Sequence, residues 1–534
     1  MKSKATVLNL ISLVLTAAFF IWFLSNDIFV GDDISEIVNL SQNTAKYNID
    51  GLYTSVLTKL FCVKIPLLLN IHPHQFSMTA GAFVRGFNIA VLCGVISLFL
   101  FIGRNKKFYL ALGTLFSAFY FCYASSNLTF MFDNILNIPH FETEGSFVLL
   151  TEYTHHFGQI FSLILGLGFI YVIADCFINN RIFDKKYLIP VSLLGFFCAS
   201  SSLYVVVITT VMLLFIFIYY LTLNLIINKK PFSDIKNELK SVLYPVVSYV
   251  LGNILFYYYT GFNRFEFADS LLSGAKTVIK TLMFAVPLET ATLFILSAVV
   301  YFMALNKTTY IKRAVFFAFA VISGICSYIC LFSAKGESFT INLVNSVILI
   351  RLTMLCLVFL LLGTCLKELS DEPKVKKFAV SVFLVIYGLF SAVQIPFVFT
   401  TMVIWRAINE ENKVTMYCIE KIYRFNSLLG QTAVLPEDAL LRIMKINAFV
   451  NDYSVKDKQI TKDTVFKYTD FTTGYYQTFY KNPRIVPYRF DEPVSAVKKF
   501  MNDGGHLTKD ELIKADFQKL YDENFVIGLN NKVR

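Results

Sequence analysis

The chain has 534 residues, of which 56% belong to the hydrophobic set AVILMFWYC and only 16% are charged. A typical soluble domain carries about 25% charged residues, so this composition excludes an ordinary soluble enzyme. The mean hydropathy of +0.59 also excludes a disordered chain. The net charge of +11 lies mostly in short segments between apolar runs, a pattern that orients membrane spans and does not indicate nucleic-acid binding.

A helix needs about 20 apolar residues to cross the hydrocarbon of a bilayer. The sequence contains eleven such runs, and we predict an all-α polytopic membrane protein with about 11 transmembrane helices. The runs lie near residues 5–25, 82–102, 108–124, 155–178, 187–201, 203–226, 241–260, 288–305, 314–333, 342–366 and 378–404. Ser200-Ser201-Ser202 marks the break between two of them, and segment 51–70 is predicted to be interfacial or re-entrant because it contains Lys59, Lys64 and Pro66.

The distribution of basic residues predicts the orientation. With a cytoplasmic N-terminus, the six inner segments carry 19 Lys and Arg residues, whereas the outer loops before residue 405 carry seven. This contrast follows the positive-inside rule. It predicts a transmembrane domain over 1–404 with outer loops at 26–81 and 125–154, and an extracytoplasmic, mostly α-helical C-terminal domain over 405–534.

An acidic pair follows the first predicted span. Asp32 and Asp33 stand at the start of the first outer loop, with Glu36 one turn further on. Adjacent carboxylates repel each other, which raises the proton affinity of one of them. Such a group can act as a general base on a hydroxyl delivered from outside. The alternative is structural, since acids at this position also cap the helix that follows.

This arrangement resembles the GT-C superfamily of integral-membrane glycosyltransferases, which use sugars linked to polyprenyl phosphate. It is most similar to the bacterial branch related to O-antigen glucosyltransferases. Thr260-Gly261-Phe262-Asn263-Arg264 is similar to a Pro-Gly-Asn-then-Arg segment of that branch, with Thr in place of Pro and an inserted Phe. Tyr47-Asn48-Ile49-Asp50-Gly51-Leu52 is similar to an aromatic-x-x-x-Gly-Arg segment whose Arg is absent here.

The resemblance implies a bacterial inner-membrane protein whose catalytic domain is the transmembrane domain 1–404, and it implies roles for named residues. Asp32 or Asp33 would be the catalytic base, and Arg264 would contact the donor phosphate. The acceptor would be a cell-envelope glycan such as O-antigen or lipopolysaccharide, a lipid or a protein. A cation beside the phosphate would stabilise the charge that develops as it leaves.

Other candidates come from position alone. Arg351 lies inside a predicted span, where a charge is a functional-site hypothesis, and we predict that it binds phosphate or pairs with Glu289. Arg85 lies near an apolar run for which the same reasoning holds. His155 and His156 start another span and, with Glu36, are candidates for binding the sugar or acceptor.

No bound metal is predicted as a cofactor, because no His, Cys or acidic cluster has a recognised ligand spacing. His72 and His74, with the other outer histidines and acids, leave a divalent cation open. Two other functions also stay open. A transporter or flippase of lipid-linked sugars would use the same interior cations without the acidic pair, and a membrane scaffold would bind a partner through its tail.

Overall fold

The computed structural model describes residues 2–25, 52–69, 71, 76–102, 108–125, 156–178, 185–260, 270–285, 288–303, 310–335, 343–370, 381 and 388. All regular structure in these ranges is helical, as the sequence predicts, because a helix satisfies its own backbone groups in an apolar setting. The elements are α1 (Lys2–Leu24), α3 (Leu52–Lys59), η1 (Leu60–Lys64), α4 (Ile65–Leu68), η2 (Ser77–Gly81), α6 (Ala82–Phe101), α7 (Phe108–Ser125), η3 (Phe157–Phe161), α10 (Ser162–Ile178), α11 (Lys185–Ala199), α12 (Leu203–Leu221), η4 (Thr222–Ile227), α13 (Phe232–Thr260), α14 (Leu271–Ala285), α15 (Leu288–Met303), α16 (Tyr310–Lys335) and α17 (Leu343–Ser370).

Six helices of the described part are long and apolar enough to cross a membrane. They begin at Ala5, Ser77, Phe157, Leu203, Val242 and Tyr310. Shorter apolar helices occupy four further predicted runs, at Tyr109–Cys122, Tyr187–Ala199, Leu293–Met303 and Leu349–Thr364. The chain is therefore a multi-pass membrane protein, and the part of it that the structure describes is all-helical. The predicted run 378–404, apart from residues 381 and 388, and the domain 405–534 lie outside the described residues, so the count of 11 spans stays a prediction.

The predicted break between two tight spans is confirmed. α11 ends at Ala199 and α12 begins at Leu203, and Ser202 adopts an extended backbone with φ −53° and ψ 139°. The Ser202 backbone N–H donates to Ser162 Oγ at 3.2 Å, which ties the turn to α10. The Ser200 and Ser201 hydroxyls donate to the Phe196 and Cys198 carbonyls of α11, so small polar residues satisfy much of the backbone at this turn.

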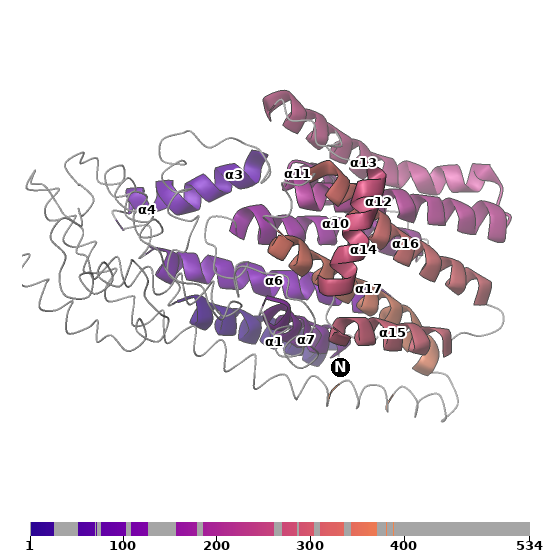
Figure 1. Cartoon of the computed structure of the whole chain (residues 1–534), viewed down its shortest axis with the longest axis horizontal. Helices are drawn as coiled ribbons and strands as arrows, with labels where there is room; N and C mark the ends of the chain where they lie inside the picture. Colours follow the sequence, from indigo (N-terminus) through magenta and orange to yellow (C-terminus); the bar gives the residue numbers. More distant parts are fainter. Residues whose placement is uncertain are drawn as a thin grey trace, which may run out of the picture.

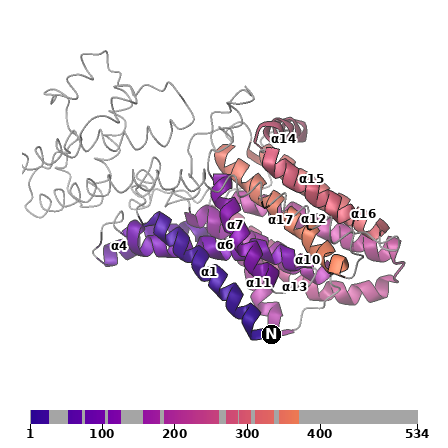
Figure 2. The same cartoon turned by 90° about the horizontal axis from the view of Figure 1, so that it is seen from below.

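Most of the helices run side by side along the long axis of the molecule, while α14 crosses them (Figures 1 and 2). We call the end at which α1 begins and α6 finishes the proximal end, and the opposite end the distal end. α1 and α6 are antiparallel, since Gly94 lies beside Leu13 and Gly86 beside Ile21. α3 lies near the distal end, where its Tyr53 ring meets Phe161 at 6.2 Å.

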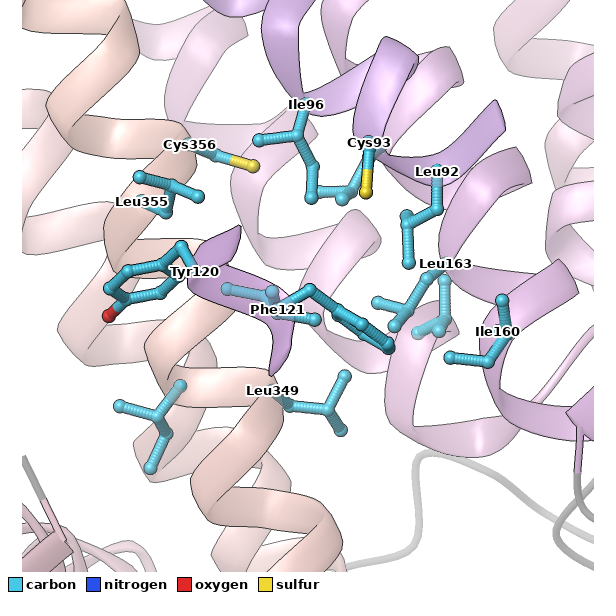
Figure 3. Packing of buried hydrophobic residues seen from close by; sticks show 14 of the residues in the cluster. Leu92, Cys93, Ile96, Tyr120, Phe121, Ile160, Leu163, Leu349, Leu355 and Cys356 are labelled. Carbon is cyan, nitrogen blue, oxygen red and sulfur yellow. The ribbon is translucent and has the colours of Figure 1, made fainter. Parts of the chain in front are cut away.

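Apolar side chains from α6, α7, α10 and α17 fill the interior, as the close view in Figure 3 shows. Cys93 and Cys356 pack there as small apolar groups, with Phe121 nearby. The outward faces are also apolar, and α13 exposes Leu243 and Leu251. An apolar surface of this kind suits lipid rather than water as its surroundings.

α1 and α6 pack closely at Gly86. A methyl group on Gly86 would lie 2.6 Å from Ile21 Cγ1 and 2.7 Å from the Ile21 backbone nitrogen, whereas one on Gly324 would meet no atom within 4 Å. We expect Gly86→Ala to destabilise the bundle by about 1–3 kcal/mol, because backbone must move to admit the methyl group.

Gly324→Ala is the matched control, with no loss of stability expected, since the new methyl group fills open space. Thermal unfolding of both variants in detergent micelles checks this. Equal midpoints for the two variants would show that α1 and α6 do not approach as closely as described.

Candidate functional site

The structure describes two of the residues predicted from sequence to form the site, His156 and Arg351. The other predicted site residues lie outside the described residues: Asp32, Asp33, Glu36, His155 and Arg264. The candidate site consists of the described residues at the distal end of the bundle.

Arg85 is the largest fully buried side chain of the described part. It lies one turn into α6, and its Nη2 donates to the Ser77 carbonyl oxygen at 3.3 Å. Ser77 begins η2, a π-helical turn that precedes α6 directly. A charged group held inside an apolar bundle is costly unless polar groups surround it, and such residues mark functional sites in membrane proteins.

His156 lies against α6 beside Arg85. Its Nε2 is 3.3 Å from Asn88 Nδ2, and the amide donates in the tautomer that keeps the proton on Nδ1. His156 is 1% exposed, and the positive charge of Arg85 acts on its ring. Gln159, three residues further along η3, is also buried. We call Arg85, Asn88, His156 and Gln159 the distal polar layer.

Several buried polar atoms near this layer have no hydrogen-bond partner among the described residues. They are His156 Nδ1, Gln159 Oε1, Ser202 Oγ and Tyr53 Oη. Burial raises the pKa of Tyr53, so its phenol stays protonated and can donate. Because buried polar atoms in folded proteins nearly always have partners, each of these four marks a position that a ligand, a water molecule or another part of the chain completes.

π-helical turns account for the local geometry of the distal end. η1, η2 and η3 all lie there, and the Phe61 ring of η1 stacks on Phe157 of η3 at 4.8 Å. A π-helical turn bonds each amide to the carbonyl five residues back, and such turns are frequent at functional sites. The widened turns before α6 and α10 flank the helical turns that carry Arg85 and His156.

Arg351 is buried in α17 at a similar depth. α17 and α6 run in the same direction, because Gly363 packs on the Leu100 carbonyl and Phe359 meets Phe116 of the antiparallel α7 at 5.8 Å. Arg351 lies twelve residues before Gly363, about 18 Å along a helix. The same step back from Leu100 on α6 reaches Asn88, so Arg351 stands at about the level of the distal polar layer.

Sequence reasoning noted Arg85 and His156 separately and missed their association and Gln159. The spacing of Arg85 and Asn88, three residues apart on one helix face, was the available signal. The predicted pairing of Arg351 with Glu289 stays a prediction, because the placement of the Glu289 side chain is not described. No group of three or more His, Cys, Asp or Glu that could hold a metal ion occurs among the described residues.

The arrangement combines two buried guanidinium groups with an imidazole and two amides at one end of an apolar bundle. Such groups can donate hydrogen bonds to an anion such as a phosphate, and the imidazole and amides can also bind hydroxyl groups. Known protein families, curated proteins and solved structures offer no match to this chain.

The contact between α6 and η3 can be tested by a double-mutant cycle on Asn88 and His156. We expect each single change to Ala to destabilise the fold by about 1–3 kcal/mol, because it leaves the buried partner unsatisfied. The double variant should then be less destabilised than the sum, with a coupling of about 0.5–3 kcal/mol. Unfolding of the four proteins in detergent micelles measures this, and strict additivity would contradict the contact.

Proposed function

We propose that the protein is a membrane glycosyltransferase that moves a sugar from a polyprenyl-phosphate-linked donor to an extracytoplasmic cell-envelope acceptor. The observation that carries the proposal is the distal polar layer, with buried Arg85 and His156 at one end of an apolar bundle and Arg351 at a similar depth. This location suits a ligand that is a lipid at one end and a phosphate with a sugar at the other.

The proposed orientation places the N-terminus in the cytoplasm of a bacterium and the distal end outside. The charge contrast between the predicted inner segments and outer loops supports it. Nucleotide sugars are cytoplasmic, so sugar transfer on the outer side needs a lipid-linked donor. The domain 405–534 would lie on the same outer side as the distal polar layer.

In the proposed reaction, the hydroxyl oxygen of the acceptor attacks the anomeric carbon of the donor sugar. Asp32 or Asp33 takes the hydroxyl proton, and the bond between the anomeric carbon and the phosphate oxygen breaks. Polyprenyl phosphate leaves with the electron pair of that bond. Arg264 and Arg351 would stabilise the charge that develops on the phosphate, while Glu36, His155 and His156 would bind sugar or acceptor hydroxyls.

The base assignment predicts the effect of removing the acidic pair. We expect Asp32→Asn/Asp33→Asn to lower the transfer rate at least about a hundredfold, because no general base then accepts the acceptor proton. The measurement uses purified protein in detergent, a panel of radiolabelled polyprenyl-phosphate sugars, and envelope extract as acceptor.

Asp175→Asn, the same chemical change on the proximal half of α10, is the matched control and should transfer at the parent rate. Equal transfer by the double variant and the parent would exclude the acidic pair as the base. Donor binding without transfer by the parent protein would instead favour a transporter or flippase of lipid-linked sugars.

The phosphate assignment predicts the effect of removing the buried cation of α17. We expect Arg351→Met to raise the KM for the donor about tenfold to a hundredfold, since a hydrogen bond to a charged group contributes about 1.5–3 kcal/mol. Arg351→Lys should be intermediate, because it keeps the charge but loses the planar fork of donors.

Arg313→Met, on the first turn of α16 at the proximal end, removes the same charge from the opposite side of the bundle and should leave the KM unchanged. Thermal unfolding of each variant separates a binding effect from loss of fold. An unchanged KM in a folded Arg351→Met protein would remove Arg351 from the site.

A further inference from the structure

A cavity of about 290 Å³ lies between α10, α12, α16 and α17, and none of the four residues of the distal polar layer lines it. Nearly all the side chains that line it are apolar or aromatic, among them Ile170 of α10, Met212 of α12, Phe319 of α16 and Met354 of α17. We call this cavity the apolar slot. The proposed transfer reaction assigns it no role.

The apolar slot is long in the direction of the helices. Its lining on α16 extends from Phe316 to Tyr328, and its lining on α17 from Ile350 to Leu360. At 1.5 Å per residue, these stretches measure about 18 Å and about 15 Å. The slot therefore reaches from the depth of Arg351 towards the proximal end, where Tyr219 packs on Phe316 at 5.3 Å.

Four side chains that line the slot carry hydroxyl groups, and three of them donate to backbone carbonyls; the fourth is Tyr219, at the proximal end. Ser323 Oγ donates to the Ala320 carbonyl at 2.8 Å, Thr353 Oγ1 to the Leu349 carbonyl at 2.8 Å, and Tyr328 Oη to the same Leu349 carbonyl at 3.1 Å. These three groups have thus already used their protons on backbone carbonyls. A ligand that needs hydrogen bonds would find little there, whereas a hydrocarbon would lose nothing by entering.

The slot is an open space and not a closely packed interface between helices. Gly324 lies on the slot, and a methyl group built on it would meet no atom within 4 Å. An apolar cavity of this kind excludes water and takes apolar molecules. A chain inserted among membrane lipids is surrounded by hydrocarbon chains that can fill such a space.

We propose that the apolar slot binds one acyl chain of a bilayer phospholipid. Lys312 and Arg313 lie on the first turn of α16, about one turn before Phe316, at the proximal end, where they would meet the phosphate of this phospholipid. A polyprenyl phosphate would place its phosphate at the distal polar layer instead.

The test is photolabelling of the full chain in vesicles, with no transfer reaction involved. One arm uses phosphatidylglycerol that carries a diazirine on an acyl chain, and the other uses a polyprenyl phosphate that carries a diazirine on the prenyl chain. Labelled peptides are then mapped by mass spectrometry. We expect the phosphatidylglycerol probe to label Met212, Met354 or Cys356. Labelling of these residues by the polyprenyl probe alone would overturn the proposal.

A bulky side chain that fills the slot should reduce this labelling. In Gly324→Trp we expect it to fall about tenfold, a loss of about 1.4 kcal/mol in binding free energy. Ile322→Trp adds the same side chain two residues away at a position that is 48% exposed, and should keep the parent labelling. Gly324→Leu repeats the test with a smaller side chain if the Trp variant fails to fold.

Labelling confined to outward residues such as Leu214, and equal in Gly324→Trp and Ile322→Trp, would overturn the proposal. The outcome is separate from that of the proposed function. If the slot is labelled but the protein transfers no sugar, the lipid-binding proposal stands and the proposed transferase function fails. If the protein transfers sugar but the slot is not labelled, the transferase function stands and the lipid-binding proposal fails.

Discussion

A guanidinium group inside an apolar helix bundle must keep hydrogen-bond acceptors around it, because the surrounding hydrocarbon offers none. Arg85 meets this requirement through the Ser77 carbonyl of the π-helical turn η2. The requirement extends outward from there. The Ser77 carbonyl that Arg85 needs belongs to the turn before α6, and the charge of Arg85 lies beside His156. His156 contacts Asn88 of α6, and this contact holds η3 against α6. The geometry of the distal end depends on accommodating this one charge.

Small residues allow the helices to approach closely enough to enclose that charge. Gly86, one residue after Arg85, brings α6 onto the backbone of α1, and Gly363 brings α17 onto the carbonyls at the other end of α6. Gly166 does the same between α10 and α12. Association in a membrane relies on such packing, since lipid is as apolar as the side chains themselves. α6 therefore packs closely against α1 and against α17, and the distal polar layer lies near its N-terminal end.

The two ends of the bundle differ in a way that fits an amphiphilic ligand. The distal end collects buried donors and acceptors, while the apolar slot runs along the helices and most of its lining hydroxyls are bonded to carbonyls. Lipids have the same division between a polar head and an apolar chain. The proposed transferase would use the distal end to hold the donor phosphate, and the slot would hold one acyl chain of a phospholipid.

Hydropathy predicted the long apolar helices, because each apolar run must form a helix to satisfy its backbone in an apolar setting. It missed α14, which lies between two predicted spans. The three serines at Ser200-Ser201-Ser202 even predicted the turn between α11 and α12, which the structure confirms. The distal polar layer could not be predicted in this way. Arg85 and His156 are 71 positions apart, and only the packing of η3 on α6 brings them together. The assignments to Asp32, Asp33 and Arg264 stay predictions, since these residues lie outside the described ranges.

The most direct test of the central claim compares the binding of polyprenyl phosphate with that of the matching polyprenol, which lacks the phosphate, to the purified protein in nanodiscs. If the buried cations at the distal end recognise phosphate, the phosphate form should bind at least about tenfold more tightly. Arg85→Met/Arg351→Met should remove that difference while the polyprenol still binds. Equal affinities for the two lipids in the parent protein would contradict the claim that the distal polar layer is a phosphate site.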